Sequence, residues 1–298
     1  MNQIKPLLSI RFMIFNNEDY INEAIEGILI QKTDFPIEVV VGDDFSTDRT
    51  LEIVKSYSNT QNITFKILDR KPYDSYWKVR KKKGRIYNFI DILNNCEGKY
   101  IALLDGDDYW TDPLKLQKQV DFLEVNKECV ICFHRANLLR ENNSLSLHPI
   151  PEISDFFEFK YSDLLRYHNF ITTSSVVFRK PIKFSIPIWF TKIPFGDLGL
   201  YKILTLNGGS IKCLNEVMSV YRIHEKGIYS KFNKKEKDKN YLTFYSIIYP
   251  ILSKEEKQIV VKKQEYKIEN LSKLKYPKFE WKQYLYKLYL SFRYPLKS

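Results

Sequence analysis

The chain has 298 residues, of which 44% are hydrophobic and 15% aromatic, so it is long and apolar enough to bury a sizeable core. This composition predicts a globular protein and excludes one that lacks a packed core. The formal net charge of +11 indicates affinity for an anionic partner, and it leaves nucleic acid, an anionic membrane surface and phosphorylated substrates as candidates.

Strands and helices alternate in the first third of the chain. Continuous apolar, β-branched runs predict strands at residues 7–15, 37–41, 63–68 and 99–105. Apolar residues at helical spacing predict helices at 18–31, 51–58 and 85–98. We expect Ser46 or Thr47 to cap the second helix. Alternating strands and helices predict an α/β fold built on a doubly wound, mostly parallel sheet.

The rest of the chain continues the alternation and then changes in composition. Helices are predicted at 114–126 and 196–209, strands at 129–139, 173–180 and 219–230, and a polar loop at 140–151. From Lys231 onward the sequence is rich in lysine, tyrosine and phenylalanine. Residues 241–252 and 279–294 are predicted to be helices within this basic tail.

The cysteines and the N-terminus bear on the cellular compartment. Cys96, Cys129, Cys132 and Cys213 lack the second pair or the nearby histidines of a zinc site, so we expect buried thiols in a reducing compartment. The N-terminal segment lacks the pattern of a signal peptide, and no apolar run reaches the roughly 18 to 20 residues that span a bilayer. The sequence therefore predicts a cytoplasmic protein, free or attached to the inner face of the membrane.

Acidic residues gather where the predicted strands end. The segment LLDGDDYW places Asp105, Asp107 and Asp108 directly after a buried strand. Carboxylates this close raise one another's pKa unless water screens them or a cation lies between them. An Asp-rich turn is the alternative, but the position favours a cation, since ligands bind at the carboxyl ends of parallel strands. Asn16 and the pair Asp43-Asp44 follow two other strands and fall on the same edge.

The order of these motifs carries a family likeness. The motifs are SI at 9–10, FN at 15–16, VGDDFSTDRT, GKYIALLDGDDYWTDPLKLQKQ, GDLGLYKIL and YRIH. Over about residues 7 to 227 the chain resembles the family 2 glycosyltransferases of the GT-A fold. The resemblance implies a Rossmann-like αβα sandwich as the catalytic domain at 1–230, with a donor half to about 112 and an acceptor half from about 113. Residues 231–298 then form a helical basic extension.

The activity that this resemblance implies is metal-dependent, inverting transfer of a sugar. The enzyme would be of the hexosyltransferase type. The expected donor is a nucleoside-diphosphate sugar, with a UDP-sugar as the first choice. The expected acceptor is a hydroxyl of a surface glycan, such as lipopolysaccharide or capsule, or of a lipid-linked saccharide. Mn²⁺ or Mg²⁺ is the expected cofactor, because carboxylate and phosphate oxygens suit such cations.

Site residues carry over from the family to matching positions. The implied metal ligands are Asp105, Asp107 and His224. The implied donor-binding residues are Phe15, Asn16, Asp43, Arg85, Asn88 and Asp105. Asp43 would accept a hydrogen bond from the nucleobase of the donor. Asp197 is the implied catalytic base, which takes the proton of the acceptor hydroxyl. The implied acceptor-side residues are Asp108, Tyr109 and Trp110.

Structural alternatives stay open for several of these residues. Asp197 has the position of a plain helix cap, His224 that of a packed histidine, and Tyr109 and Trp110 that of core aromatics. The chain also departs from the family at Ile14, where relatives often carry a hydroxyl, and at Phe45, which adds a ring where they often carry glycine. Because of these departures, the resemblance does not specify the nucleobase or the sugar of the donor.

Two other functions fit part of the sequence. A nucleotidyltransferase would share the sheet and the acidic metal site, but it needs a glycine-rich loop after the first strand, and no glycine precedes Gly27. A nucleic-acid-binding protein would explain the charge and the aromatic-basic tail but not the clustered aspartates, so no nucleic acid is expected as a partner. The tail either contacts an anionic membrane surface or packs on the catalytic domain.

Overall fold

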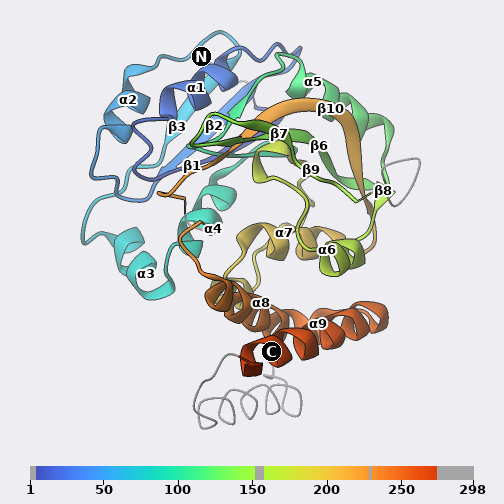
Figure 1. Cartoon of the computed structure of the whole chain (residues 1–298). Helices are drawn as coiled ribbons and strands as arrows, with labels where there is room; N and C mark the ends of the chain where they lie inside the picture. Colours follow the sequence, from blue (N-terminus) through green and yellow to red (C-terminus); the bar gives the residue numbers. More distant parts are fainter. Residues whose placement is uncertain (1–4, 152–157, 228–229, 274–298) are drawn as a thin grey trace.

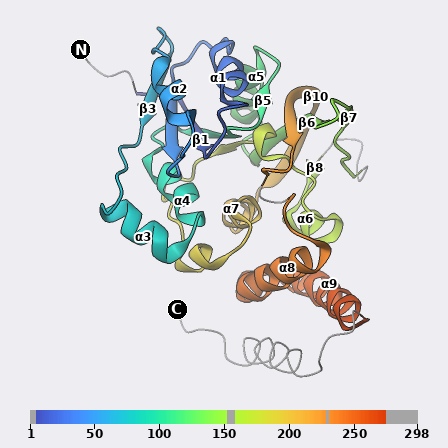
Figure 2. The same ribbon diagram turned by 60° about the vertical axis from the view of Figure 1, so that its left-hand side comes forward.

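The computed structural model describes residues 5–151, 158–227 and 230–273 (Figure 1). One ten-stranded mixed sheet runs through the molecule in the main order β3-β2-β1-β4-β9-β6-β10-β5, with β7 on β6 and β8 on β10. Helices cover both faces of this sheet, and two further helices, α8 and α9, lie below the lower layer (Figures 1 and 2). This arrangement confirms the predicted αβα architecture.

The N-terminal half supplies the parallel part of the sheet. Its strands are β1 Leu8–Ile14, β2 Ile37–Asp43, β3 Ile63–Ile67 and β4 Tyr100–Asp105. Its helices are α1 Ile21–Leu29, α2 Thr50–Ser56, α3 Ser75–Lys83 and α4 Ile86–Asn95. Every residue of β2 is buried, as expected of an interior parallel strand covered on both faces. All three strand pairs, β1 with β2, β1 with β4 and β2 with β3, are parallel.

The C-terminal half extends the sheet with mixed pairings. Its strands are β5 Tyr109–Trp110, β6 Cys129–Arg140, β7 Leu145–Leu147, β8 Glu158–Phe159, β9 Val177–Arg179 and β10 Ser210–Ile223. Its helices are α5 Lys115–Val125, α6 Tyr161–Tyr167 and α7 Gly196–Thr205, with 3₁₀ turns η1 Thr173–Ser175 and η2 Ile188–Lys192. β10 runs parallel to β6 and then pairs antiparallel with β5.

Alternation along the strands divides the core into two layers. Leu8, Ile10, Phe12 and Ile14 pack against α1 and α5 on one face of the sheet. Ile101 and Leu103 of β4 face the other layer, which contains α4, α6 and α7. Successive strand residues point to opposite faces, so each central strand serves both layers. Asp105 comes two residues after Leu103, so its side chain points to the same face of the sheet, toward the layer of α4 and α7.

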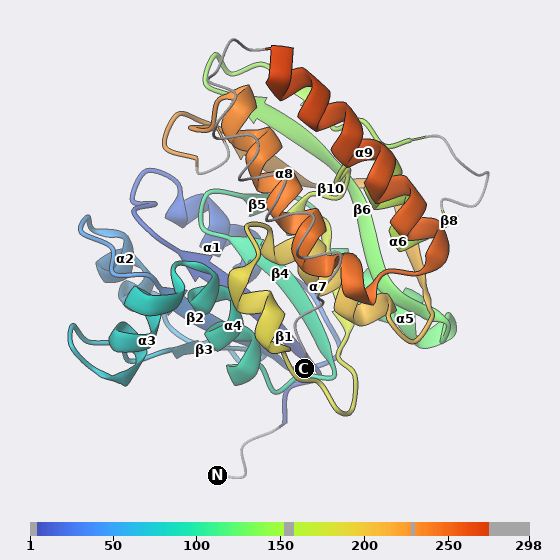
Figure 3. The same cartoon turned by 90° about the horizontal axis from the view of Figure 1, so that it is seen from below.

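The C-terminal helices pack beneath this second layer. The extension forms α8 Lys234–Ile248, the 3₁₀ turn η3 Tyr249–Ile251 and α9 Lys254–Lys273, and α8 and α9 run side by side (Figure 3). Phe244, Tyr245 and Ile248 of α8 and Val260 of α9 are buried in the core cluster that contains α7. No helix in the described ranges is long and apolar enough to cross a membrane.

Most predicted elements are confirmed, and the differences have local causes. Neither Ser46 nor Thr47 caps α2, because the helix begins later and Asp48 accepts the hydrogen bond from the Thr50 amide at 3.0 Å. Residues 140–151 include the short strand β7, and β10 begins at Ser210 rather than Ser219. The sequence did not predict α3, α6, α9, β5 or β8. The helix expected at 279–294 lies outside the described residues.

The four cysteines are buried and free, as predicted. Burial raises the pKa of Cys96 to about 12 and that of Cys129 to about 11, so these thiols stay protonated at neutral pH. They act as small apolar core residues.

Candidate active site

Strand register brings the acidic groups to one edge of the sheet. Ile14 of β1 pairs with Asp43 of β2, and Met13 pairs with Asp105 of β4. The two aspartates therefore flank β1 at the carboxyl ends of three adjacent parallel strands. This edge is where ligands bind in open α/β sheets.

Asp105 has a counterion inside the fold. Arg11, in the middle of β1, is 0% exposed and donates through Nη1 to Oδ1 of Asp105 at 2.8 Å. Its guanidinium also lies 4.7 Å from the ring centroid of Phe89 on α4. Burial raises the pKa of Asp105, and the charge of Arg11 opposes that rise. Sequence reasoning missed Arg11, although a lone arginine inside the apolar strand LSIRFMI was a signal.

Asp107 meets His224 across the site. Nε2 of His224 lies 3.1 Å from Oδ2 of Asp107, and the histidine ring packs against Tyr20 with centroids 4.8 Å apart. Arg222 holds the turn beneath, because its Nη1 donates to the carbonyl of Asp107 at 2.8 Å. Its backbone amide donates to Oδ1 of Asp108 at 3.0 Å. Pairing of β10 with β5 thus brings the YRIH segment against the aspartate turn.

The Asp107–His224 pair fits a divalent cation that also binds phosphate. In the described ranges, no group of three or more His, Cys, Asp or Glu residues forms a ready metal site. Carboxylate oxygen and imidazole nitrogen nevertheless suit Mn²⁺, and Mg²⁺ is commonly held by one or two carboxylates together with substrate phosphates. Nδ1 of His224 is buried without a hydrogen-bond partner in the described part of the chain, so the ring is not committed elsewhere. Asp105 is already paired with Arg11.

The three residues predicted on the acceptor side differ in exposure. Asp108 is 1% exposed, and burial together with the charge of Asp107 raises its pKa well above the usual range. Trp110 is 2% exposed, and its indole Nε1 donates to the carbonyl of Ser174 at 2.7 Å. Its ring therefore packs in the core and does not face an acceptor, which corrects the prediction for this residue. Tyr109 is half-buried beside Arg222.

The loops after β1 and β2 hold Asp43, the residue predicted to bind the nucleobase of the donor. Asp43 accepts two hydrogen bonds from Ser46, one from the amide at 3.0 Å and one from the hydroxyl at 2.5 Å. Asn16, at φ +50°, donates its amide to the hydroxyl of Ser46 at 3.0 Å and accepts through Oδ1 from the amide of Thr47 at 2.8 Å. Burial raises the pKa of Asp43. Phe15 stays half-exposed at the edge.

The two remaining donor-binding predictions fall in different environments. Asn88 is buried, donates to the carbonyl of Gly42 at 3.0 Å and accepts from Nη1 of Arg70 at 2.6 Å. Both ends of its amide thus serve the fold. Arg85 is exposed at the start of α4, and the described residues give it no ion pair. The nearby Asp44 is instead held by Arg80, with contacts of 2.8 and 2.6 Å.

Asp197 lies in the first turn of α7 and faces the same site. Its Oδ2 accepts from Nδ2 of Asn169 at 2.5 Å, and its Oδ1 accepts from the amide of Leu198 at 2.8 Å. Burial raises its pKa, and the charge of Asp105 adds to the rise. The nearby amides of the helix N-terminus favour the ionised form. Asn169 is a second residue that sequence reasoning missed, and we find no motif that would have marked it.

Tyr221 shows that the four carboxylates share one region. Its pKa is raised first by burial and then by the charges of nearby aspartates. These aspartates are Asp108, Asp107, Asp105 and Asp197. The structure therefore brings the implied metal ligands and the implied base together, although they come from β4, the turn after it and α7. The roles assigned to them stay predictions.

Several known proteins are similar in sequence to this chain. The family model described as glycosyl transferase family 2 matches residues 9–184. An uncharacterized protein of Mycobacterium tuberculosis (strain ATCC 25618 / H37Rv) is 37% identical over 225 residues, which are 74% of this chain and 60% of that protein. The chain therefore spans less than two thirds of that relative's length. The Escherichia coli UDP-Glc:alpha-D-GlcNAc-diphosphoundecaprenol beta-1,3-glucosyltransferase WfaP is 28% identical over 222 residues, covering 73% of this chain and 78% of that one.

Solved structures show the same fold. Staphylococcus aureus TarS 1-349 in complex with UDP-GlcNAc superposes with a TM-score of 0.58 at 21% identity, over 86% of this chain and 70% of that chain. The mannosyltransferase PcManGT from Pyrobaculum calidifontis, in complex with GDP-Man and Mn²⁺, gives a TM-score of 0.54 at 14% identity, over 98% of this chain and 82% of that chain. At these identities the likeness establishes the fold alone.

Proposed function

Because the chain belongs to glycosyl transferase family 2, we propose that it is a metal-dependent, inverting glycosyltransferase that uses a nucleoside-diphosphate sugar. One observation carries the proposal. Asp107 and His224 converge to 3.1 Å on the same edge of the sheet that Asp197 faces from α7. A phosphate-binding site and a base on one edge are what sugar transfer from a diphosphate requires.

Asp197 is the proposed base. The acceptor hydroxyl attacks the anomeric carbon from the face opposite the diphosphate, so a new C–O bond forms while the bond from that carbon to the diphosphate oxygen breaks. The leaving diphosphate keeps the electron pair, and the hydroxyl proton passes to Asp197. Because attack and departure occur on opposite faces, the anomeric configuration inverts. The bonds from Asn169 and Leu198 fix both carboxylate oxygens of Asp197 before substrate binds.

Asp107 and His224 are the proposed ligands of a divalent cation, with Asp105 as the third candidate. When bound, the cation supplies Lewis-acid stabilisation of the departing diphosphate. Mn²⁺ is the first choice, since the structure of PcManGT contains it together with a nucleotide sugar. Arg222 keeps Asp107 and Asp108 in place through two hydrogen bonds, so the ligand turn is formed in advance.

A UDP-sugar is the proposed donor. TarS was solved with UDP-GlcNAc, and the name of WfaP specifies UDP-Glc. Asp43, fixed by Ser46, is the proposed acceptor of a hydrogen bond from the base. Arg85 is the proposed cation for the donor phosphates, because it is exposed near this edge and the described residues leave its guanidinium without an ion pair.

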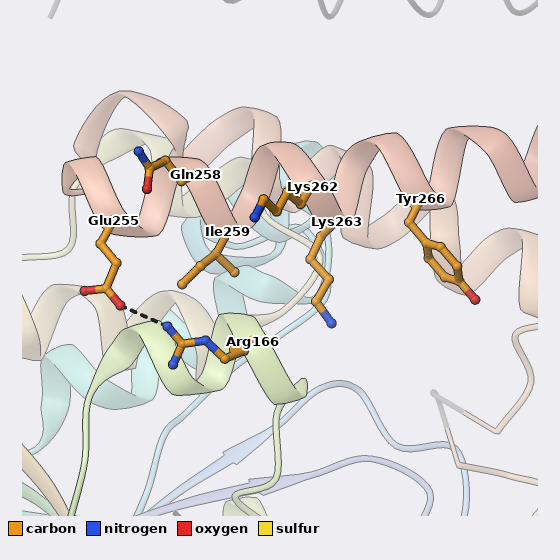
Figure 4. A pocket seen from close by; sticks show the side chains of 7 residues that line it. All are labelled: Arg166, Glu255, Gln258, Ile259, Lys262, Lys263 and Tyr266. Carbon is orange, nitrogen blue, oxygen red and sulfur yellow. Dashed lines mark hydrogen bonds and ion pairs between the residues drawn. The ribbon is translucent and has the colours of Figure 1, made fainter.

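The acceptor is proposed to be lipid-linked or part of a surface polysaccharide, since the name of WfaP specifies a diphosphoundecaprenol substrate. The basic face of α9 supports contact with an anionic membrane. A shallow groove of about 610 Å³ lies between α6 and α9, and Lys262, Lys263 and Tyr266 line it (Figure 4). Lysines attract anionic headgroups, and a tyrosine ring suits the interface.

Vesicle binding tests this membrane contact. Truncation at residue 231 would remove buried core residues of α8, so charge reversal on α9 is the cleaner change. Lys254 and Lys262 both line a neighbouring groove beside α9. Lys254→Glu/Lys262→Glu should abolish sedimentation with phosphatidylglycerol vesicles and leave the melting temperature unchanged. Equal sedimentation of the variant and the wild type would contradict the contact.

A donor panel tests the enzymatic proposal. UDP-, GDP- and dTDP-sugars are incubated with the protein and Mn²⁺ or Mg²⁺, and release of the nucleoside diphosphate and the thermal shift are measured. We expect one UDP-sugar to stabilise the protein and to be hydrolysed slowly in a metal-dependent way. Absence of binding to any nucleotide sugar with either metal would overturn the proposal.

A further inference from the structure

The candidate base is held by a side chain whose orientation is itself fixed. Asn169 donates through Nδ2 to Oδ2 of Asp197 at 2.5 Å. Its own Oδ1 accepts the amide of Ile171 at 3.2 Å, which turns the NH₂ group toward Asp197. The bond joins the segment after α6 to the first turn of α7, 28 residues apart. Breaking it would leave Oδ2 of Asp197 free to rotate.

One aromatic ring of the C-terminal extension packs against both segments that carry this bond. Tyr241 of α8 lies edge-on to His168, which precedes Asn169, with ring centroids 5.7 Å apart. Its ring centroid also lies 4.8 Å from that of Phe195, two residues before Asp197. Aromatic pairs at these separations add stabilisation beyond the area that they bury.

The same helices also hold the body of α7. Lys202 of α7 donates to both carboxylate oxygens of Glu256 on α9, at 2.9 and 2.7 Å, and both side chains are buried. The ring of Phe244 packs edge-on against Phe195, with centroids 5.7 Å apart. A buried, doubly bonded ion pair is costly to break because it leaves an unpaired charge in the core. The extension therefore fixes α7 at its first turn and on its buried face.

We infer that Asn169 is a positioning residue for the Asp197 carboxylate, and that Tyr241 holds the two segments that this hydrogen bond joins. The inference rests on the proposed function, in which Asp197 is the base. It makes the C-terminal helices part of the catalytic apparatus rather than an appendage. Catalysis tolerates little displacement of a base, and a shift of about 1 Å can reduce the rate a hundredfold.

Steady-state kinetics with matched variants test this inference. The probe is the nucleotide sugar selected by the donor panel, with release of its nucleoside diphosphate as the readout and circular dichroism to measure the folded fraction. Asn169→Ala should lower kcat by about ten- to a hundredfold with the donor KM unchanged. Tyr241→Ala should lower kcat about tenfold per folded molecule, and Tyr241→Phe, which keeps the ring, should restore it. Tyr241→Leu replaces Tyr241→Ala if that variant does not fold.

A second asparagine provides the control for lost stability. Asn62 donates to the carbonyl and the hydroxyl of Thr33 at 3.0 and 2.8 Å, at the opposite edge of the sheet. Asn62→Ala removes comparable hydrogen bonds and should lower the melting temperature without changing kcat. A reduced kcat in Asn169→Ala that is absent from Asn62→Ala supports positioning.

The results separate the inference from the function on which it rests. If Asp197→Asn is inactive while Asn169→Ala and Tyr241→Ala keep the kcat of the wild type, the positioning role is wrong. The role of Asp197 as the base is then still supported. If Asp197→Asn keeps the full rate, the proposed base is wrong, and the inference is wrong with it. A donor KM that rises while kcat is unchanged also contradicts positioning, because it would place Asn169 in donor binding.

Discussion

Nε2 of His224 lies 3.1 Å from Oδ2 of Asp107, although 117 residues separate them in the sequence. β10 makes this possible, because Ser219 and Val220 pair with β6 on one side and with β5 on the other, and β5 directly follows the aspartate turn. The relationship joins the turn after β4 to the end of β10. It also defines the place where a cation and a diphosphate are proposed to meet.

Removal of the imidazole should weaken cation binding. His224→Ala leaves Asp107 as the one proposed ligand free of an ion pair, so the Kd for Mn²⁺ should rise by about ten- to a hundredfold. Isothermal titration calorimetry with Mn²⁺, with and without UDP, measures the change. His148→Ala is the control, because His148 lies beside β7 and not on the proposed ligand turn. Equal Mn²⁺ affinity in His224→Ala and wild type would contradict the role of His224.

Removal of the buried Arg11 should lower the stability of the protein and raise its affinity for Mn²⁺. Arg11→Met takes away the counterion of Asp105, so the metal-free protein should lose about 1–3 kcal/mol of unfolding free energy in urea. The same change makes the acidic site more negative, so Mn²⁺ affinity should rise by about three- to tenfold. Arg11→Met/Asp105→Asn should recover part of the lost stability. Weaker or unchanged Mn²⁺ binding in Arg11→Met would show that Arg11 does not oppose the cation.

Arg85 and Asn88, the two predicted donor-binding residues at the start of α4, should respond differently to substitution. Arg85→Ala should raise the donor KM by about tenfold with little change in melting temperature, because the residue is exposed and the described residues give it no ion pair. Asn88→Ala should lower stability by about 1–3 kcal/mol, because the buried carbonyl of Gly42 loses the bond from the Asn88 amide and Nη1 of Arg70 loses one of its two acceptors. Donor kinetics and thermal melts of both variants decide between these outcomes. A change in KM for Asn88→Ala alone would reverse the assignment.

A buried lysine at the start of α5 should give the protein a characteristic pH dependence. Lys115, at the start of α5, is fully buried, and its Nζ lies 4.1 Å from the ring centroid of Trp110. Burial lowers its pKa to about 7. Since the unfolded chain keeps the ordinary, higher pKa, unfolding takes up a proton between these two values, and stability rises with pH across that window.

Lys115→Met tests this dependence. At about pH 7 the variant should be more stable than the wild type by about 1–3 kcal/mol, because no unpaired amine is buried. This advantage should shrink by about 2 kcal/mol toward pH 9, since wild-type stability rises there and the variant lacks the titrating group. Urea unfolding at several pH values measures the difference. A constant difference across this range would show that Lys115 has an ordinary pKa in the folded protein.

The parallel sheet and its acidic edge were predictable because they depend on local pattern. β4 is a continuous apolar run, YIALL, and Asp105 follows it directly. Helix α3 escaped prediction because its lysine-rich sequence lacks apolar periodicity. It is instead set by its ends, where Asp74 accepts from the amide of Trp77 at 2.6 Å and Gly84 adopts φ +77°.

Side-chain partners distant in sequence could not be predicted. The single arginine of β1 is visible in the sequence, but its partner Asp105 lies 94 positions away. Asn169 sits in a segment without a motif, and only the fold brings it to Asp197. The prediction for Trp110 failed for a related reason. Its place beside the aspartates suggested the site, but pairing of β5 with β10 turned its ring into the core.

Asp107 is proposed to hold the cation on which departure of the donor diphosphate depends. The most direct measurement is the rate of nucleoside-diphosphate release from the nucleotide sugar selected by the panel, in the presence of Mn²⁺, for wild type and Asp107→Asn. The substitution preserves the shape of the side chain and removes its charge. We expect a rate at least about a hundredfold lower in the variant with an unchanged fold. Release at the wild-type rate by Asp107→Asn would contradict it.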